Sequence, residues 1–195
     1  MAHYSAVTKS EYASKSWYKI ENYRFVSEER TAPLVAAEFQ KACINFPIAW
    51  LKNNNQFEPI ALLGLVEAEN LYVDARYNWI GAYVPAHFRS QPFRLVPTAE
   101  NTLTLGVRED IGLVSDDDSG YAFFNEDGEL SAEVQEVVDM LRNLESNRAA
   151  TQKATQALEQ AGLLTPWEIS PMVYGQPKKL GGLYHVSQQA LNNLD

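Results

Sequence analysis

The sequence predicts an α+β fold, with a mainly antiparallel sheet, an N-terminal helix before it and one long C-terminal helix after it. Three observations lead to this prediction. Apolar residues recur with helical spacing over residues 33–46. Short apolar runs separated by turn residues follow over residues 48–107, with no helical pattern between them. A second helical stripe begins after Ser131.

The first helix is predicted over residues 33–46, with Thr31 as its N-cap and Pro33 in its first turn. Pro47 ends it, because proline interrupts helical hydrogen bonding. Cys43, the only cysteine, lies on the predicted apolar face, so we expect it to be buried and expect no disulfide or thiolate metal cluster. That face consists of Val35, Phe39, Ala42, Cys43 and Phe46.

Six strands are predicted next, in three pairs that are each joined by a turn. Asparagines in the loop over residues 52–56 favour a hairpin there. The other two turns are predicted at residues 75–78 and 97–101. The three pairs are Ile48–Leu51 with Phe57–Leu65, Leu71–Asp74 with Trp79–Val84, and Phe93–Val96 with Leu103–Val107.

The long helix is predicted from a Ser131 cap to Gly162, a residue type that commonly follows a helix. At 1.5 Å per residue it spans roughly 46 Å, against a diameter of about 42 Å for a compact domain of this size. We therefore expect it to cross the whole molecule or to break near Asn143–Arg148. Its second half is polar enough to be exposed or to pack on a partner, which includes self-association. Three short strands are predicted after it: Trp167–Ile169, Met172–Tyr174 and Gly182–Val186.

Length and charge limit the classes of function. The 195 residues fit one domain, over residues 31–195, preceded by an N-terminal arm over residues 1–30. The net charge is −9, and residues 108–129 carry −7 of it, which argues against nucleic acid and anionic membranes as partners. Without an apolar run long enough to cross a bilayer, and without a signal peptide in the sequence, we expect a soluble, cytoplasmic protein that does not insert into membranes.

The strongest candidate binding segment combines aromatic rings, a guanidinium and a rigid turn within fifteen residues. Its candidate binding residues are Trp79, Tyr83, His87 and Arg89. Trp, Tyr and Arg anchor binding surfaces because they bury a large area and keep a polar group. The alternative is that Trp79 and Tyr83, four residues apart, fill the core. The sequence contains no recognised catalytic motif, so we predict no catalytic residue and no cofactor, and a non-enzymatic protein is the leading hypothesis, with an enzyme as the alternative.

Two metal hypotheses stay open. His87 and His185 with Asp74 would give the two-histidine, one-carboxylate set that non-haem iron uses. This set is the alternative hypothesis, that of a metal-dependent enzyme or a ligand-binding partner of an oxygenase- or halogenase-type system. Asp116, Asp118 and Gly120 give part of a calcium loop, but the remaining ligand positions do not match. A solvated acidic loop is the simpler interpretation.

Five blocks of sequence, in one order along nearly the whole chain, resemble the SapC family of bacterial surface-layer-associated proteins. The blocks are Pro33–Phe39 with Phe46–Ile48; Leu62–Leu65 with Glu69–Asp74; Trp79–Ala86 with Arg89 and Phe93; Phe123–Glu129; and Leu180–Tyr184 with Val186 and Leu191. The resemblance implies relatives that usually continue into a further C-terminal segment, which this chain, ending at Asp195, lacks.

The resemblance also implies an association with surface layers and genes that sometimes lie beside outer-membrane receptors and flavin-dependent halogenase-like enzymes. It supplies no catalytic residue. We therefore expect a non-enzymatic accessory protein that binds a protein partner, in surface-layer assembly or export, with an association at the cell surface.

Overall fold

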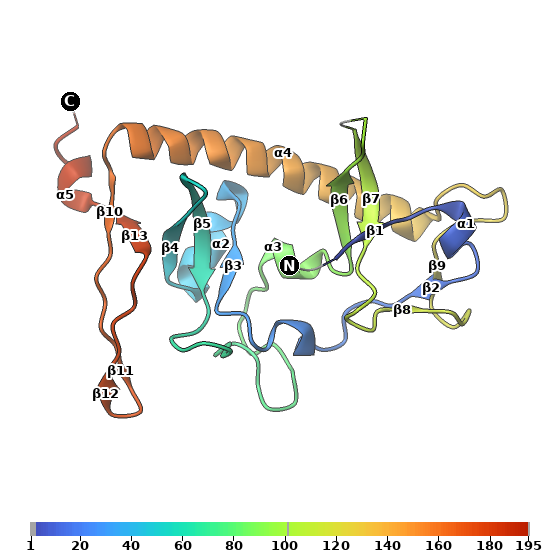
Figure 1. The fold of residues 1–195 in the computed structure, drawn as a ribbon, viewed down its shortest axis with the longest axis horizontal. Helices are drawn as coiled ribbons and strands as arrows, with labels where there is room; N and C mark the ends of the chain where they lie inside the picture. The colour runs from blue at the N-terminus through green and yellow to red at the C-terminus, as the bar shows by residue number, and fades with distance from the viewer. Residues whose placement is uncertain (1–2, 101, 195) are drawn as a thin grey trace. The chain divides into compact units, whose positions relative to one another are not determined.

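The computed structural model describes residues 3–100 and 102–194 (Figure 1). It mixes helices with strands, and every pairing between the described strands is antiparallel, which confirms the predicted α+β class. The chain divides into two compact units. Unit 1 comprises the residues up to Asn22 together with Phe88–Ser146, and unit 2 comprises Tyr23–His87 together with the residues from Asn147 onward.

Unit 1 contains two three-stranded sheets, with strand orders β1-β7-β6 and β8-β2-β9. The predicted hairpin of residues 93–107 is confirmed as β6 paired with β7. The first part of the long helix α4 (Ala132–Gln160) also belongs to unit 1. Its other elements are β1 (Ser5–Ala6), α1 (Lys9–Tyr12), β2 (Ser16–Trp17), β6 (Phe93–Pro97), β7 (Leu103–Val107), β8 (Val114–Ser115) and β9 (Tyr121–Ala122).

The core of unit 1 is apolar and rich in aromatic rings. Trp17 meets Phe93 edge to face, with ring centroids 4.9 Å apart, and Tyr12 lies 5.1 Å from Phe123. Residues near the N-terminus thus supply two of the largest buried side chains. The sequence predicted an arm over residues 1–30 and one domain over residues 31–195. Whether residues 31–195 fold without the arm is not tested by the packing, so this division stays a prediction. The buried cluster consists of Tyr12, Trp17, Phe93, Leu105, Val107, Phe123, Val134, Val138 and Leu141.

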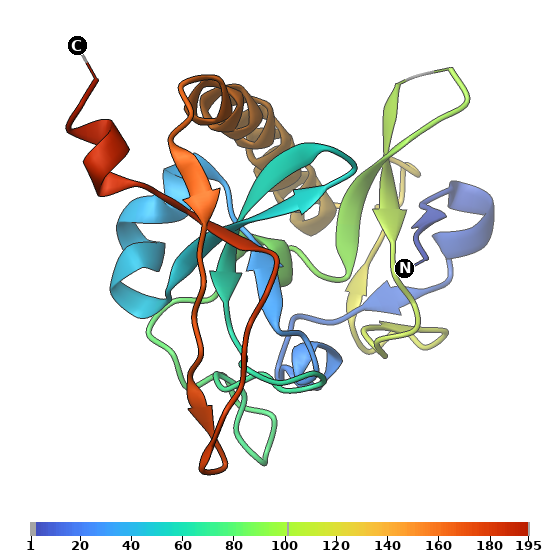
Figure 2. The ribbon, with the colours of Figure 1, turned by 60° about the vertical axis from the view of Figure 1, so that its left-hand side comes forward.

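Unit 2 is built on a five-stranded sheet with the order β10-β13-β4-β5-β3. Both figures show this sheet with the hairpin β11–β12 extending beyond it (Figures 1 and 2). Short helices complete the unit. The chain passes from unit 2 to unit 1 between His87 and Phe88, within the short helix α3. The elements are η1 (Arg24–Val26), β3 (Thr31–Pro33), η2 (Ala36–Glu38), α2 (Phe39–Asn45), β4 (Ile48–Asn53), β5 (Gln56–Leu62), α3 (Ala86–Arg89), β10 (Leu164–Pro166), β11 (Met172–Val173), β12 (Gln176–Pro177), β13 (Leu183–Val186) and α5 (Gln188–Leu191).

The predicted hairpin in unit 2 is confirmed as β4 and β5. Asn54 and Asn55 form its two-residue turn, with φ angles of 47° and 61°. Asparagine tolerates this left-handed conformation better than most residues, and two such residues match the twist of paired strands. The asparagine-rich loop therefore specifies the turn directly.

The first helix is shorter than predicted. Thr31–Pro33 is not a helix start but the edge strand β3, in which Pro33 lies opposite Ile60. An edge strand tolerates a proline because one side of the strand needs no ladder donor. A 3-10 turn, η2, then precedes α2. This turn interrupts the spacing on which the predicted apolar face depended, so Cys43 is exposed rather than buried.

Three further strand predictions are wrong. The segments Leu71–Asp74 and Trp79–Val84 share only a single bridge, between Val73 and Trp79. The predicted turn at residues 75–78 is present, because the Asp74 carboxylate accepts hydrogen bonds from the backbone N–H groups of Arg76 and Asn78. In the tail, the strand predicted at Trp167–Ile169 is also absent. The strand β10 ends just before it, and the segment forms only an isolated bridge between Ile169 and Leu180.

Helix α4 is unbroken over 29 residues. The Ser131 hydroxyl accepts a hydrogen bond from the Val134 N–H at 3.3 Å, as an N-cap should, and Gly162 follows the helix with φ +67°. The predicted break near Asn143–Arg148 does not occur, although the boundary between the two units lies there, between Ser146 and Asn147.

The second half of α4 is not simply exposed, because it packs within unit 2 through polar contacts. Gln152 donates to Gln56 at 2.9 Å, and Lys52 lies 3.4 Å from Glu159. Thr151, which is buried, accepts a hydrogen bond from the Ala36 N–H at 2.7 Å. Self-association through this helix stays a prediction.

None of the helices in the described ranges, 3–100 and 102–194, combines the length and the apolar character that crossing a bilayer requires.

Candidate functional site

The predicted binding segment forms a closed turn in unit 2. The Trp79 indole Nε1–H donates to the Tyr83 carbonyl oxygen at 2.8 Å, and both side chains are half-buried. The two residues lie in the irregular segment between β5 and α3 rather than on a strand. The strand predicted over Trp79–Val84 is absent, and the two side chains shape a loop.

An aromatic cluster holds this loop. The Trp79 ring stacks on Tyr72, with centroids 5.7 Å apart, and also meets Tyr23 at 5.5 Å. Phe46 lies at its centre and meets Tyr72 edge to face at 4.8 Å. Each such aromatic pair contributes about 0.5–1.5 kcal/mol beyond area burial. The aromatic cluster consists of Tyr23, Phe46, Tyr72, Trp79 and Tyr83.

Glu38 fixes the far end of the same loop. Its buried carboxylate accepts hydrogen bonds from the Tyr83 hydroxyl at 2.7 Å, the Ala86 N–H at 2.7 Å and the Val35 N–H at 3.1 Å. Three donors satisfy a charge that would otherwise be costly to bury. Sequence reasoning missed Glu38, although a signal existed: it lies on the predicted apolar helix face, between Val35 and Ala42, where a carboxylate needs an explanation.

The four predicted binding residues do not all belong to one compact unit. Trp79, Tyr83 and the half-buried His87 belong to unit 2, whereas the exposed Arg89 belongs to unit 1. The geometry assigns Trp79 and Tyr83 a packing role in the loop. A binding role for these four residues stays a prediction.

The structure does not assemble the two-histidine, one-carboxylate set. The Asp74 carboxylate caps its own turn, and hydrogen bonds from the Asn78 side chain and backbone lower its pKa. His185 lies on β13, with Nε2 3.3 Å from the Thr165 hydroxyl. No group of three or more His, Cys, Asp or Glu side chains among the described residues is placed to hold a metal ion. The hypothesis of a metal-dependent enzyme therefore has no support.

The acidic loop of unit 1 is organised around Asp117. Its carboxylate accepts hydrogen bonds from the hydroxyl groups of Ser119 at 2.6 Å, Tyr18 at 2.7 Å and Ser115 at 2.7 Å. These bonds hold the pKa of Asp117 far below its usual range. Its oxygens are therefore occupied by donors, while Asp116 and Asp118 are exposed. This arrangement matches the simpler interpretation, a solvated acidic loop.

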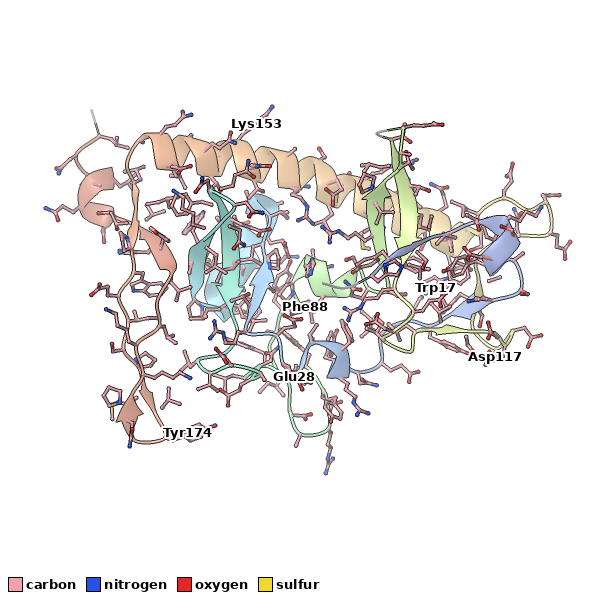
Figure 3. The ribbon with its side chains drawn as sticks, in the orientation of Figure 1. Trp17, Glu28, Phe88, Asp117, Lys153 and Tyr174 are labelled. Carbon is pink, nitrogen blue, oxygen red and sulfur yellow. The ribbon has the colours of Figure 1, made fainter. Side chains whose placement is uncertain are left out.

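Exposed apolar side chains gather on two loops of unit 2, the loop that carries Trp79 and the hairpin β11–β12, and sequence reasoning did not single out these apolar side chains. Ile80 is 63% exposed and Tyr174, at the turn of the hairpin β11–β12, is 86% exposed. Both loops project toward the same side in Figures 1 and 2, and Tyr174 is labelled in Figure 3. The Tyr174 hydroxyl donates to Glu69 at 3.4 Å, which connects the two loops. We call this set the apolar margin; it consists of Leu71, Tyr77, Ile80, Met172 and Tyr174.

A comparison with protein-family models gives a match that spans almost the whole chain. The model described as SapC matches residues 7–195. No curated protein and no solved structure matches this chain.

Proposed function

Since this chain belongs to the SapC family, we propose that it is a non-enzymatic accessory protein that binds a protein partner in the assembly or export of a surface layer. The observation that supports the proposal is the apolar margin, in which five large apolar side chains are exposed on two connected loops of unit 2. Clusters of exposed apolar residues commonly mark protein–protein contact sites.

The aromatic cluster restricts the loop that carries Ile80 of the apolar margin. Trp79 and Tyr83 flank Ile80, and their contacts with Phe46, Tyr72 and Glu38 restrict the loop that carries it. A restricted loop loses less conformational entropy on binding than a flexible one. We therefore assign contact with the partner to Ile80 and Tyr174, and positioning of the loop to Trp79 and Tyr83.

The test is a crosslinking pull-down of the tagged chain from the cells that produce it, with cytosol and envelope fractions analysed separately. We expect one envelope or surface-layer protein in stoichiometric amount with the wild type. The double variant Ile80→Ser/Tyr174→Ser should reduce its recovery at least about tenfold, because two interface anchors are lost.

Ile44→Ser is the matched control. Ile44 is 83% exposed on α2 and lies outside the apolar margin, so its replacement removes a similar apolar area without touching the proposed contact. Equal recovery of the partner with the double variant would show that the margin is not the contact surface. Recovery of a soluble oxidoreductase, or of no protein, would contradict the accessory function itself.

A further inference from the structure

A cavity of about 260 Å³ lies in unit 2, over one face of the five-stranded sheet. It adjoins residues 178–183, the segment between β12 and the start of β13. The apolar margin and the predicted binding residues contribute nothing to its lining. It is therefore separate from the surface proposed above for the protein partner.

Four leucines form the apolar part of the cavity wall. Leu183 on β13 lies directly opposite Leu51 on β4, and such cross-strand partners point to the same face of a sheet. Leu62 on β5 and Leu180 belong with Leu183 to one buried cluster, against which Leu51 packs. These four leucines all line the cavity and give it a surface suited to an aliphatic group.

The rim of the cavity is cationic. Arg30, Lys178 and Lys179 line it, with one carboxylate, Glu67, which gives a local charge of +2 in a chain of net charge −9. Arg30 and Lys178 form no ion pair with any residue of the described ranges. Lys179 lies 3.7 Å from Glu168, but both side chains are largely exposed, so this pair is weak and exchangeable.

The size of the cavity limits its occupant. At about 30 Å³ per water molecule it has room for about nine waters, and it lies just below the range of about 300–1,000 Å³ that is typical of sites enclosing a whole drug-sized ligand. It suits one small group, such as a single amino-acid residue or a short acyl chain. Leucines beside a rim of net positive charge favour a molecule with an aliphatic part and a negative end.

We propose that this cavity binds a carboxylate attached to a short aliphatic group, with Arg30, Lys178 and Lys179 recognising the carboxylate and the leucines contacting the aliphatic part. Two sources share this chemistry: the last residue of a peptide chain, and a short fatty acid. The inference goes beyond the proposed function and does not depend on it.

The first experiment titrates the full chain with N-acetyl-leucine by isothermal titration calorimetry, with N-acetyl-leucinamide as the uncharged control. We expect N-acetyl-leucine to bind and the amide to bind at least about fivefold more weakly, because the amide removes the charge that the cations recognise. Octanoate in a parallel titration distinguishes the sources. Tighter binding of octanoate points to a fatty acid, and tighter binding of N-acetyl-leucine points to a peptide end.

The variants separate a built site from general charge attraction. Lys178→Gln/Lys179→Gln should weaken binding about fivefold, whereas Lys153→Gln, an exposed lysine on α4 outside the cavity lining (Figure 3), should not change it. Gly181→Leu should weaken binding, because Gly181 lines the cavity and a larger side chain there competes for its space. A Cβ added at Gly181 meets nothing within 4 Å, so this variant should fold normally.

Absence of binding by both carboxylates, or equal binding of acid and amide, would overturn the proposal, as would unchanged affinity in Gly181→Leu with a native circular dichroism spectrum. Ile80→Ser should keep full affinity for N-acetyl-leucine. A failure of the partner pull-down and a failure of this site can therefore be told apart.

Discussion

The two halves of helix α4 pack by different chemistry. Before Ser146 the helix buries Val134, Val138 and Leu141 in the apolar core of unit 1. After that point its buried residues are Thr151 and Thr155, both 4% exposed. One continuous helix therefore meets unit 1 through apolar contact and unit 2 through hydrogen bonds and ion pairs.

The difference shows what a periodic pattern can and cannot reveal. An apolar stripe identifies its buried face by itself, because burial of hydrocarbon is favourable wherever it occurs. A polar group that becomes buried contributes to stability only where a partner satisfies it. For Thr151 that partner is the Ala36 N–H, 115 residues away in the sequence. Thr151 lies on the weak continuation of the apolar stripe, seven residues after Leu144, but the stripe does not identify the partner.

The largest effect should come from the apolar half. Leu141→Ala should lower the free energy of unfolding by about 2–5 kcal/mol, since Leu141 is 2% exposed and truncation leaves a cavity. Urea unfolding followed by circular dichroism measures it. Met140→Ala, at an exposed neighbouring position, is the control and should change stability by less than about 0.5 kcal/mol. Equal effects of the two variants would show that the first half of α4 is not packed as described.

The polar half can be tested by removing a single hydroxyl group. Thr151→Val keeps the shape of the side chain but leaves the Ala36 N–H without its acceptor, so we expect a loss of about 1–3 kcal/mol. Thr155→Val is the matched control. Thr155 is equally buried on the same helix, but its hydroxyl group makes no hydrogen bond to another element of the described ranges, so its replacement should be nearly neutral. Similar losses for both variants would contradict the role given to the Thr151 hydroxyl.

A smaller loss of stability should appear at high pH, where the buried Tyr12 of the unit 1 core titrates. Burial and the hydrogen bond that its hydroxyl donates to Glu109 at 2.8 Å raise the pKa of Tyr12 to about 12, above its ordinary value of 10. Between pH 10 and 12 the folded state therefore holds a proton that the unfolded state has released. This contribution to stability is complete below pH 10 and is lost as the pH rises toward 12.

The measurement compares the free energy of unfolding at pH 9 and pH 11 in the wild type and in Tyr12→Phe. The wild type should lose roughly 1.4 kcal/mol more than the variant over this interval. The variant cancels the contribution of every other group that titrates there. Parallel losses in the two proteins would mean that Tyr12 does not titrate abnormally.

Local signals predicted the parts of the fold that depend on neighbours in sequence. Three local predictions are confirmed: the asparagines of the β4–β5 turn and Gly162 act through their backbone preferences, and Ser131 caps the helix through its hydroxyl group. Predictions failed where a distant segment decided the outcome. Pro33 lies in a strand because Ile60 lies opposite it, a pairing that helical periodicity does not reveal.

The candidate site shows the same division. The concentration of aromatic residues around Trp79 correctly located an ordered segment, but not the role of its side chains. Glu38 determines where this loop ends, and 45 residues separate it from Tyr83. The apolar margin was missed because its two loops, around Ile80 and Tyr174, are connected only in three dimensions.

The sequence by itself determined the α+β class, the hairpins of residues 48–62 and 93–107, the cap and end of the long helix, and the resemblance to one family. The structural features follow from the preferences and apolar spacing of a few neighbouring residues, and the resemblance from five blocks of sequence in one order along the chain. The tertiary structure alone decided which polar side chains are buried, which apolar ones stay exposed, and where cations meet leucines in a cavity. The reason is physical: the free energy of a buried hydrogen bond or of an apolar contact depends on its partner, and the partner is placed by the fold.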